Sequence, residues 1–253
     1  MDDTVHHTIL SHRMPCQPDA REITAAVERH VTNREQSNLE RCPTCALRGR
    51  SCVCDRLNSI TSPLKLTIIR HRKEVSRGSN SARILAYSVE GTTIIEHGSR
   101  YSGPTVLPEG CLYNAVLLFP MFYDPDPNHR PLEWTGQFVP NNLIVLDGSW
   151  KQTSRMLKKI EGLTALPRIS VRPLIPPLPR IRKPYFEGGM CTMEASISAL
   201  QQFLRTEQVE QLKQNYLIWL DQVRKNSGIR NPLKAGQCFK EARIAESNDE
   251  DER

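Results

Sequence analysis

Apolar runs and helical repeats alternate along the middle of the chain. Short apolar runs with the length of buried strands lie at residues 66–69, 92–95, 114–119, 143–146 and 169–171. Apolar residues recur at helical spacing over residues 81–89, 150–160, 192–205 and 207–224. This alternation predicts an α/β fold, with a mainly parallel sheet flanked by helices.

The best-defined junction between a predicted strand and a predicted helix follows residues 143–146. The strand ends at Asp147, and Ser149 can cap the helix that comes next. That helix is amphipathic, with Lys151 and Arg155 on its cationic face. Because ligands bind at the carboxyl ends of strands in open α/β sheets, we predict a ligand site beside Asp147. The alternative is an ordinary turn, in which Asp147 caps the helix and the cationic side chains are solvated.

Polar side chains also gather in the segment that follows the first predicted strand. They are His71, Glu74, Arg77, Asn80 and Arg83, and they would lie at the same edge of the sheet. The alternative is an exposed polar loop. Pairing of His71 with Glu74 would give either an acid/base dyad or a structural hydrogen bond, and the sequence leaves both open.

A second turn rich in glycine precedes the helix predicted from residue 192. Gly188 and Gly189 allow the backbone to approach a ligand closely, with the helix N-terminus facing it, although a plain turn has the same pattern. The segment before this turn, residues 173–184, is rich in proline and is predicted to be a stiff extended connector.

Four of the eight cysteines fall close together, at Cys42, Cys45, Cys52 and Cys54. A Cys-x-x-Cys pair followed by a Cys-x-Cys pair can surround one tetrahedral ion, and four thiolate ligands are typical of a closed, structural zinc site. We therefore predict a zinc-knuckle module over residues 38–58. The alternative is four reduced thiols in a basic loop. The flanking arginines suggest that the module also contacts phosphates.

Net charge and the distribution of apolar residues limit the classes of protein that the sequence fits. The chain has 253 residues and a net charge of +6, which is compatible with a polyanionic partner. No apolar run predicts a membrane span or a signal segment, so we expect an intracellular protein, cytoplasmic or, in a eukaryote, also nuclear. Residues 1–37 are predicted to be a tail with an amphipathic helix at 21–36. Residues 122–140 are expected to form a long loop, and residues 226–253 a polar, partly disordered tail with an acidic end.

Several of these motifs, in this order, resemble those of the DTW-domain family of tRNA-uridine aminocarboxypropyltransferases. The family signature is Asp-x-Thr-Trp, and here Ser149 stands in place of the threonine. The cysteine cluster, the segment from His71 to Arg83 and the Glu-Gly-Gly-x-Cys-Thr-x-Glu-Ala run at residues 187–195 also match. The resemblance implies a SPOUT-like, knotted catalytic domain over residues 59–225.

The resemblance also implies an activity and roles for individual residues. The activity is transfer of the 3-amino-3-carboxypropyl group of S-adenosyl-L-methionine to N3 of a tRNA uridine, which forms acp3U. The catalytic residues would be Asp147, as the base for the uracil N3 proton, with Ser149 and Trp150. The cofactor site would comprise Leu118, Phe119, Pro120, Leu146, Gly188, Gly189, Cys191 and Thr192. The RNA contacts would come from Arg77, Asn80, Arg83, Lys151, Arg155, Arg180 and Arg182.

Two other functions compete with this interpretation. A methyltransferase that acts on RNA would share the fold and the S-adenosyl-L-methionine pocket but present a different carbon of the sulfonium. A zinc-knuckle protein that binds RNA without catalysis would not need Asp147 at all. A monomer is the favoured oligomeric state, and no membrane partner is expected.

Overall fold

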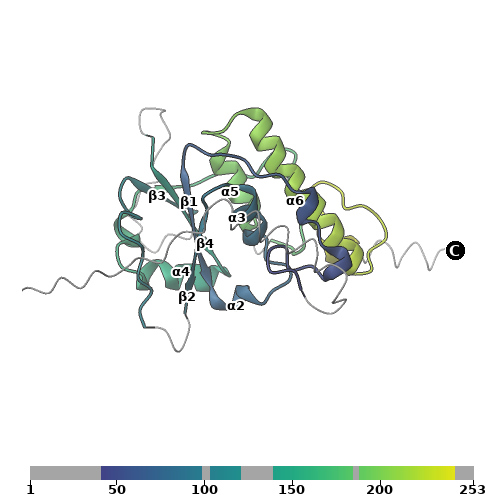
Figure 1. Cartoon of the computed structure of the whole chain (residues 1–253), viewed down its shortest axis with the longest axis horizontal. Coiled ribbons are helices and arrows are strands. Elements are labelled where there is room, and N and C mark those ends of the chain that lie inside the picture. The colour runs from purple at the N-terminus through teal and green to yellow at the C-terminus, as the bar shows by residue number, and fades with distance from the viewer. Residues whose placement is uncertain (1–40, 99–102, 121–138, 185–187, 243–253) are drawn as a thin grey trace, which may run out of the picture.

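A five-stranded parallel sheet forms the centre of the molecule (Figure 1). The computed structural model describes residues 41–98, 103–120, 139–184 and 188–242, and structural statements refer to these ranges. The strands are β1 Lys65–His71, β2 Thr93–His97, β3 Ala115–Leu118, β4 Asn142–Asp147 and β5 Arg168–Ile169. Their spatial order is β2-β1-β4-β3-β5. The predicted α/β fold with a parallel sheet is confirmed.

Helices cover both faces of this sheet, which makes a three-layer arrangement (Figure 1). The helices on one face are α3 Ala82–Ser88, α5 Thr192–Leu200 and α6 Thr206–Asn226, and the opposite face carries α4 Trp150–Lys159. Along β4, Leu143 and Val145 belong to the apolar cluster beneath α3, α5 and α6, while Ile144 and Leu146 belong to the cluster beneath α4. Every residue of β4 is buried, which explains the uninterrupted apolar run at residues 143–146.

The strand order places a crevice at the carboxyl ends of β1 and β4. These two strands pair directly, and Arg70 lies opposite Asp147 in their register. From β1 the chain continues to β2 on one side of the pair, whereas from β4 it continues to β5 on the other side. The two connections leave in opposite directions, so the space between them stays open for a ligand.

Several element boundaries differ from those predicted. The polar segment after β1 contains a short helix, α2 Arg72–Val75, which begins where the Nδ1 atom of His71 accepts a hydrogen bond from the backbone N–H of Lys73. Short 3-10 turns also lie at Gly49–Ser51, Cys54–Arg56 and Leu163–Ala165. The helix predicted to reach residue 205 ends at Leu200. The predicted helix at 21–36, most of the loop at 122–140 and the acidic end lie outside the described residues.

The cysteine module packs onto the α/β domain rather than standing apart. Its residues Cys45 and Val53 are fully buried and belong to the same apolar cluster as α6. The indole N–H of Trp219 donates to the carbonyl of Cys45 at 3.1 Å, and the hydroxyl of Tyr87 donates to the carbonyl of Cys54 at 3.1 Å. The module thus contributes to one shared core. The domain limits and the knot remain predictions.

The described part of the segment after α6 packs against the rest of the protein, and the partial disorder of the tail stays a prediction. The backbone N–H of Arg180 donates to the carbonyl of Gln237, and the N–H of Gly236 donates to the carbonyl of Pro177. Ile229 and Phe239 are buried in the main core. Two kinds of contact therefore fix this segment: a few buried apolar residues, and hydrogen bonds to the backbone of the proline-rich connector. Its polar composition did not predict this packing. Among the described helices, none is long and apolar enough to cross a membrane.

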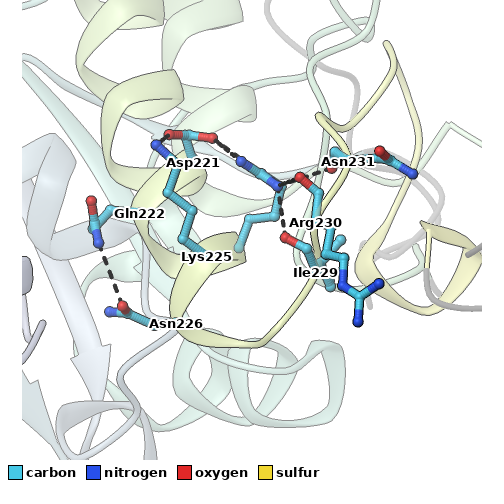
Figure 2. A network of polar contacts seen from close by, with 8 residues as sticks. Asp221, Gln222, Lys225, Asn226, Ile229, Arg230 and Asn231 are labelled. Atoms are coloured by element: carbon cyan, nitrogen blue, oxygen red, sulfur yellow. Dashed lines mark hydrogen bonds and ion pairs between the residues drawn. The ribbon is translucent and has the colours of Figure 1, made fainter.

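Arg224 fastens this segment to the end of α6. Figure 2 labels the residues that it contacts on α6 and after it, Asp221, Ile229, Arg230 and Asn231. Its guanidinium is buried, and its Nη1 atom lies 2.7 Å, 2.5 Å and 3.1 Å from the carbonyl oxygens of Ile229, Arg230 and Asn231. The Nη2 atom donates to Asp221 at 2.7 Å. The neighbouring Lys225 also pairs with Asp221, but it is exposed.

Replacing Arg224 should therefore cost much more stability than replacing its neighbour. Arg224→Met leaves buried carbonyls without a donor, and we expect the free energy of unfolding to fall by about 2–4 kcal/mol. Lys225→Met removes an exposed pair and should change it by about 0.5 kcal/mol or less. Urea unfolding of both variants measures the difference, and equal midpoints would show that the buried network contributes nothing.

Candidate active site and metal centre

Asp147 is a buried carboxylate at the carboxyl end of the central strand β4. It is 4% exposed, and each of its oxygens accepts one short hydrogen bond. The amide Nδ2 of Asn80 donates to Oδ2 at 2.6 Å, and the hydroxyl of Thr192 donates to Oδ1 at 2.7 Å. Asn80 comes from the segment after β1, and Thr192 is the first residue of α5. Three segments that are distant in the sequence therefore converge on one carboxylate.

The turn after Asp147 forms as the sequence predicted. Ser149 is the N-cap residue of α4, and its backbone N–H donates to the Oε1 atom of Gln152 at 2.7 Å. Lys151 and Arg155 are exposed, while Met156 is buried against the sheet. Trp150 is half-buried and lies in the wall of the cavity described next.

A cavity of about 700 Å³ opens beside Asp147. Its size is within the range of sites that enclose a small molecule or cofactor. The structure brings all eight predicted cofactor residues and all three predicted catalytic residues to its wall: Leu118, Phe119, Pro120, Leu146, Gly188, Gly189, Cys191, Thr192, Asp147, Ser149 and Trp150. Of the predicted RNA contacts, Asn80, Lys151, Arg180 and Arg182 also line it.

The cavity wall includes one acidic residue that the predicted site did not list, Glu74. Glu74, on α2, is 2% exposed, and burial raises the pKa of its carboxyl group. It pairs with Arg77 at 3.0 Å and with Arg182, from the proline-rich connector, at 3.8 Å. His71 instead caps α2 and contacts the ring of His97, so the His71–Glu74 pairing that we considered is not formed. Only the polar spacing after β1 signalled Glu74 in the sequence.

A second buried carboxyl group lies behind the glycine turn. Glu194 is fully buried and accepts a hydrogen bond from the Nη2 atom of Arg180 at 2.9 Å. Burial raises the pKa of Glu194, and its contacts with Arg180 act in the opposite direction. Burial also raises the pKa of the Cys191 thiol, which agrees with a packed residue rather than a nucleophile. The hydroxyl of Tyr216 donates to the carbonyl of Pro179, tying α6 to the connector.

Three of the predicted RNA contacts have internal partners instead. Asn80 is buried against Asp147, and Arg180 is buried against Glu194. Arg83 donates to backbone carbonyls of the cysteine module and of α2. Because these polar groups are used inside the protein, their geometry does not support the surface role that we predicted. Arg77, Lys151, Arg155 and Arg182 are exposed, as an RNA contact requires.

The four clustered cysteines form a compact set of sulfur atoms. All four sulfurs lie within 4.8 Å of one another, with Cys42 and Cys54 3.6 Å apart and Cys45 and Cys52 3.7 Å apart. A tetrahedral ion with metal–sulfur bonds of about 2.3 Å would place its sulfurs about 3.8 Å apart. The cluster can therefore hold one metal ion, and the all-sulfur donor set fits zinc.

Comparison with known families connects these features. The family model of the DTW domain matches residues 39–224, which include both the cysteine cluster and the cavity. The chain belongs to the DTW-domain family. This is the family of tRNA-uridine aminocarboxypropyltransferases, and membership supports a tRNA-modifying function. No solved structure matches the chain.

The metal site of this DTW protein yields a direct test. We expect one zinc ion per chain in purified protein, because each sulfur of the cluster is already within reach of a common centre. Cys45→Ser should lower the metal content, whereas Cys111→Ser, at a buried cysteine outside the cluster, should leave it unchanged. Elemental analysis of the three proteins decides this. Metal-free wild-type protein with four freely reactive thiols would contradict the assignment.

Proposed function

We propose that this protein transfers the 3-amino-3-carboxypropyl group of S-adenosyl-L-methionine to N3 of a uridine in tRNA. The observation that carries the proposal is the buried carboxylate of Asp147, held by two donors at the edge of a cofactor-sized cavity. Family membership supplies the class of chemistry. The structural metal would be zinc, and the cell compartment would be the cytoplasm, or also the nucleus in a eukaryote.

Asp147 is suited to accept the uracil N3 proton. A carboxylate has about four lone-pair sites, and Asn80 and Thr192 occupy two of them, one on each oxygen. The remaining lone pairs can accept a proton while the two donors hold the carboxylate in one orientation. Such fixed geometry is what general base catalysis needs, because the base must lie within hydrogen-bond reach of the proton it removes.

The reaction balances with Asp147 as the proton acceptor. When bound, S-adenosyl-L-methionine supplies a sulfonium that activates the carbon chain for attack and leaves as a neutral thioether. The uracil N3 atom loses its proton to Asp147 and forms a bond to the terminal carbon of the aminocarboxypropyl group, while the bond from that carbon to sulfur breaks. The protein selects this carbon over the methyl group by orientation.

The exposed cationic residues near the cavity suit the tRNA backbone. Lys151 lies in the cavity wall, and Arg155 follows one helical turn later on the exposed face of α4. Arg182 also lies in the cavity wall, and both Arg182 and Arg77 pair with Glu74. These exposed cations on α4, on the connector and after α2 would hold the phosphate backbone of a tRNA near the cavity. We propose that the protein binds and modifies tRNA as a monomer.

A methyltransferase acting on tRNA remains the second candidate, because the same pocket would serve it with the methyl carbon turned toward uracil. Nucleoside mass spectrometry of tRNA incubated with the protein and S-adenosyl-L-methionine separates the two by the mass added to uridine. An RNA-binding protein without catalysis would add no mass and would bind tRNA regardless of S-adenosyl-L-methionine.

Asp147→Asn tests the role of the carboxylate. The substitution is nearly isosteric and should keep the fold and most of the tRNA affinity, since the cationic groups provide the phosphate contacts. An amide cannot accept the uracil proton, so single-turnover transfer at saturating tRNA should fall by about 10²–10⁴-fold.

Lys151→Gln and Arg155→Gln provide the matched comparison. Both should weaken tRNA binding and make it less sensitive to salt, with a smaller effect on the rate at saturating tRNA. An unchanged rate in Asp147→Asn would remove Asp147 as the base and leave it with the role of bracing the turn before α4.

A further inference from the structure

Arg83 joins the cysteine cluster to the active-site wall. Its Nη1 atom donates to the carbonyl of Pro43 at 3.2 Å and lies 3.5 Å from the carbonyl of Thr44. These two carbonyls belong to the turn between the first two clustered cysteines. The Nη2 atom donates to the carbonyl of Val75, the last residue of α2, at 2.8 Å. One guanidinium thus connects the turn between two candidate metal ligands with a helix that contributes to the cavity wall.

A second contact joins the same two regions. The Nη1 atom of Arg41 donates to the carbonyl of Ala46 within the cysteine module. It also lies against Gly78, where an added Cβ atom would be 2.6 Å away. Only glycine allows so close an approach without a shift. The cysteine module therefore lies directly against the segment after α2 at Gly78, and it is connected to the end of α2 through Arg83.

This segment leads directly to Asp147. The backbone N–H of Arg77 donates to the carbonyl of Glu74 at 3.2 Å, and the N–H of Asn80 donates to the carbonyl of Arg77 at 3.1 Å. These consecutive turns set the place of Asn80, whose amide donates to Asp147 at 2.6 Å. A displacement of α2 would therefore move a donor that orients the carboxylate.

We propose that Arg83 is a positioning residue that couples the cysteine-ligated turn to the orientation of Asp147. Its expected effect on the rate rests on the proposed function, but its structural effect does not. This assignment replaces the phosphate contact predicted from the sequence. The metal centre then has a second role besides stability, since the turn that it fixes supplies two of the three carbonyls facing Arg83.

The chemistry of the side chain supports this role. A planar guanidinium presents donors in fixed directions and can bind carbonyls on two segments at once, whereas the ammonium of lysine is a compact point charge. Burial, followed by the nearby charge of Arg70, lowers the pKa of Arg83, in line with a cost of placing a charge there. Its fixed carbonyl partners offset that cost only while both segments stay in place.

Arg83→Lys and Arg83→Gln separate positioning from RNA binding, with Arg155→Gln as the comparison. If Arg83 is a positioning residue, both variants should lower the single-turnover rate by about tenfold to a hundredfold. Both should keep the salt dependence of tRNA binding, which Arg155→Gln should reduce by a slope of about one. Recovery of the rate in Arg83→Lys, together with a reduced salt slope in Arg83→Gln, would overturn the proposal in favour of a phosphate contact.

A double-mutant cycle tests whether Arg83 acts through Asp147. In the Asp147→Asn background, Arg83→Gln should have little further effect on the rate, because the orientation of the base no longer matters. An equal loss in both backgrounds would mean that Arg83 acts elsewhere. A merely structural role would lower the thermal midpoint without producing this non-additivity.

Hydrogen exchange tests the coupling without any reaction, so failure of the proposed function would not obscure it. Chelation of the metal from wild-type protein should speed exchange of the backbone amides of residues 74–80. In Arg83→Gln these amides should already exchange faster, and chelation should add little. Unchanged exchange at residues 74–80 after metal removal from wild-type protein would overturn the coupling even if the protein transfers the group to tRNA.

Discussion

The site depends on one buried carboxylate and the two donors that satisfy it. Burying Asp147 at the end of the central strand would be costly if its oxygens had no partners. Asn80 and Thr192 supply those partners from opposite sides, one from the segment after β1 and one from the start of α5. The fold must therefore close around Asp147 before the carboxylate is stable there, which ties assembly of the cavity to completion of the sheet and its helices.

Two further carboxyl groups near Asp147 are also buried. Glu74 and Glu194 both lie at the cavity wall or behind it, and each is matched by arginine from the connector, Arg182 and Arg180 respectively. Pairs of this kind contribute little net stability, but breaking one leaves an uncompensated charge inside the protein. The main effect of these ion pairs is therefore to fix the position of the connector beside the pocket. Their net contribution to stability is small.

The sequence predicted best those features that depend on neighbouring residues. The strand at 143–146, the cap at Ser149 and the exposed face with Lys151 follow from local periodicity, and all are present. The cofactor residues implied by the family resemblance also line one cavity, because parallel strands present their carboxyl ends together.

Features that depend on distant partners could not be predicted in the same way. Arg83 and Arg180 look like surface arginines in the sequence, and only the folded chain brings Pro43 or Glu194 to them. The helix α2 was missed because its start depends on a side-chain cap from His71 in an otherwise polar run. The packing of the segment after α6 was not predicted, because the groups that anchor it, Arg224 and the backbone of the connector, lie elsewhere in the sequence.

The segment after α6 extends the part of the chain that shapes the cavity beyond the end of the family match. The family match stops at residue 224, yet residues 236 and 237 bond to the backbone of Pro177 and Arg180, on the strip of chain that walls the cavity. Excision at the family boundary would remove this outer support while leaving every cavity-lining residue in place. The C-terminal segment thus supports the wall of the pocket. Substitutions in this segment would change the shape of the pocket although they alter no motif of the family.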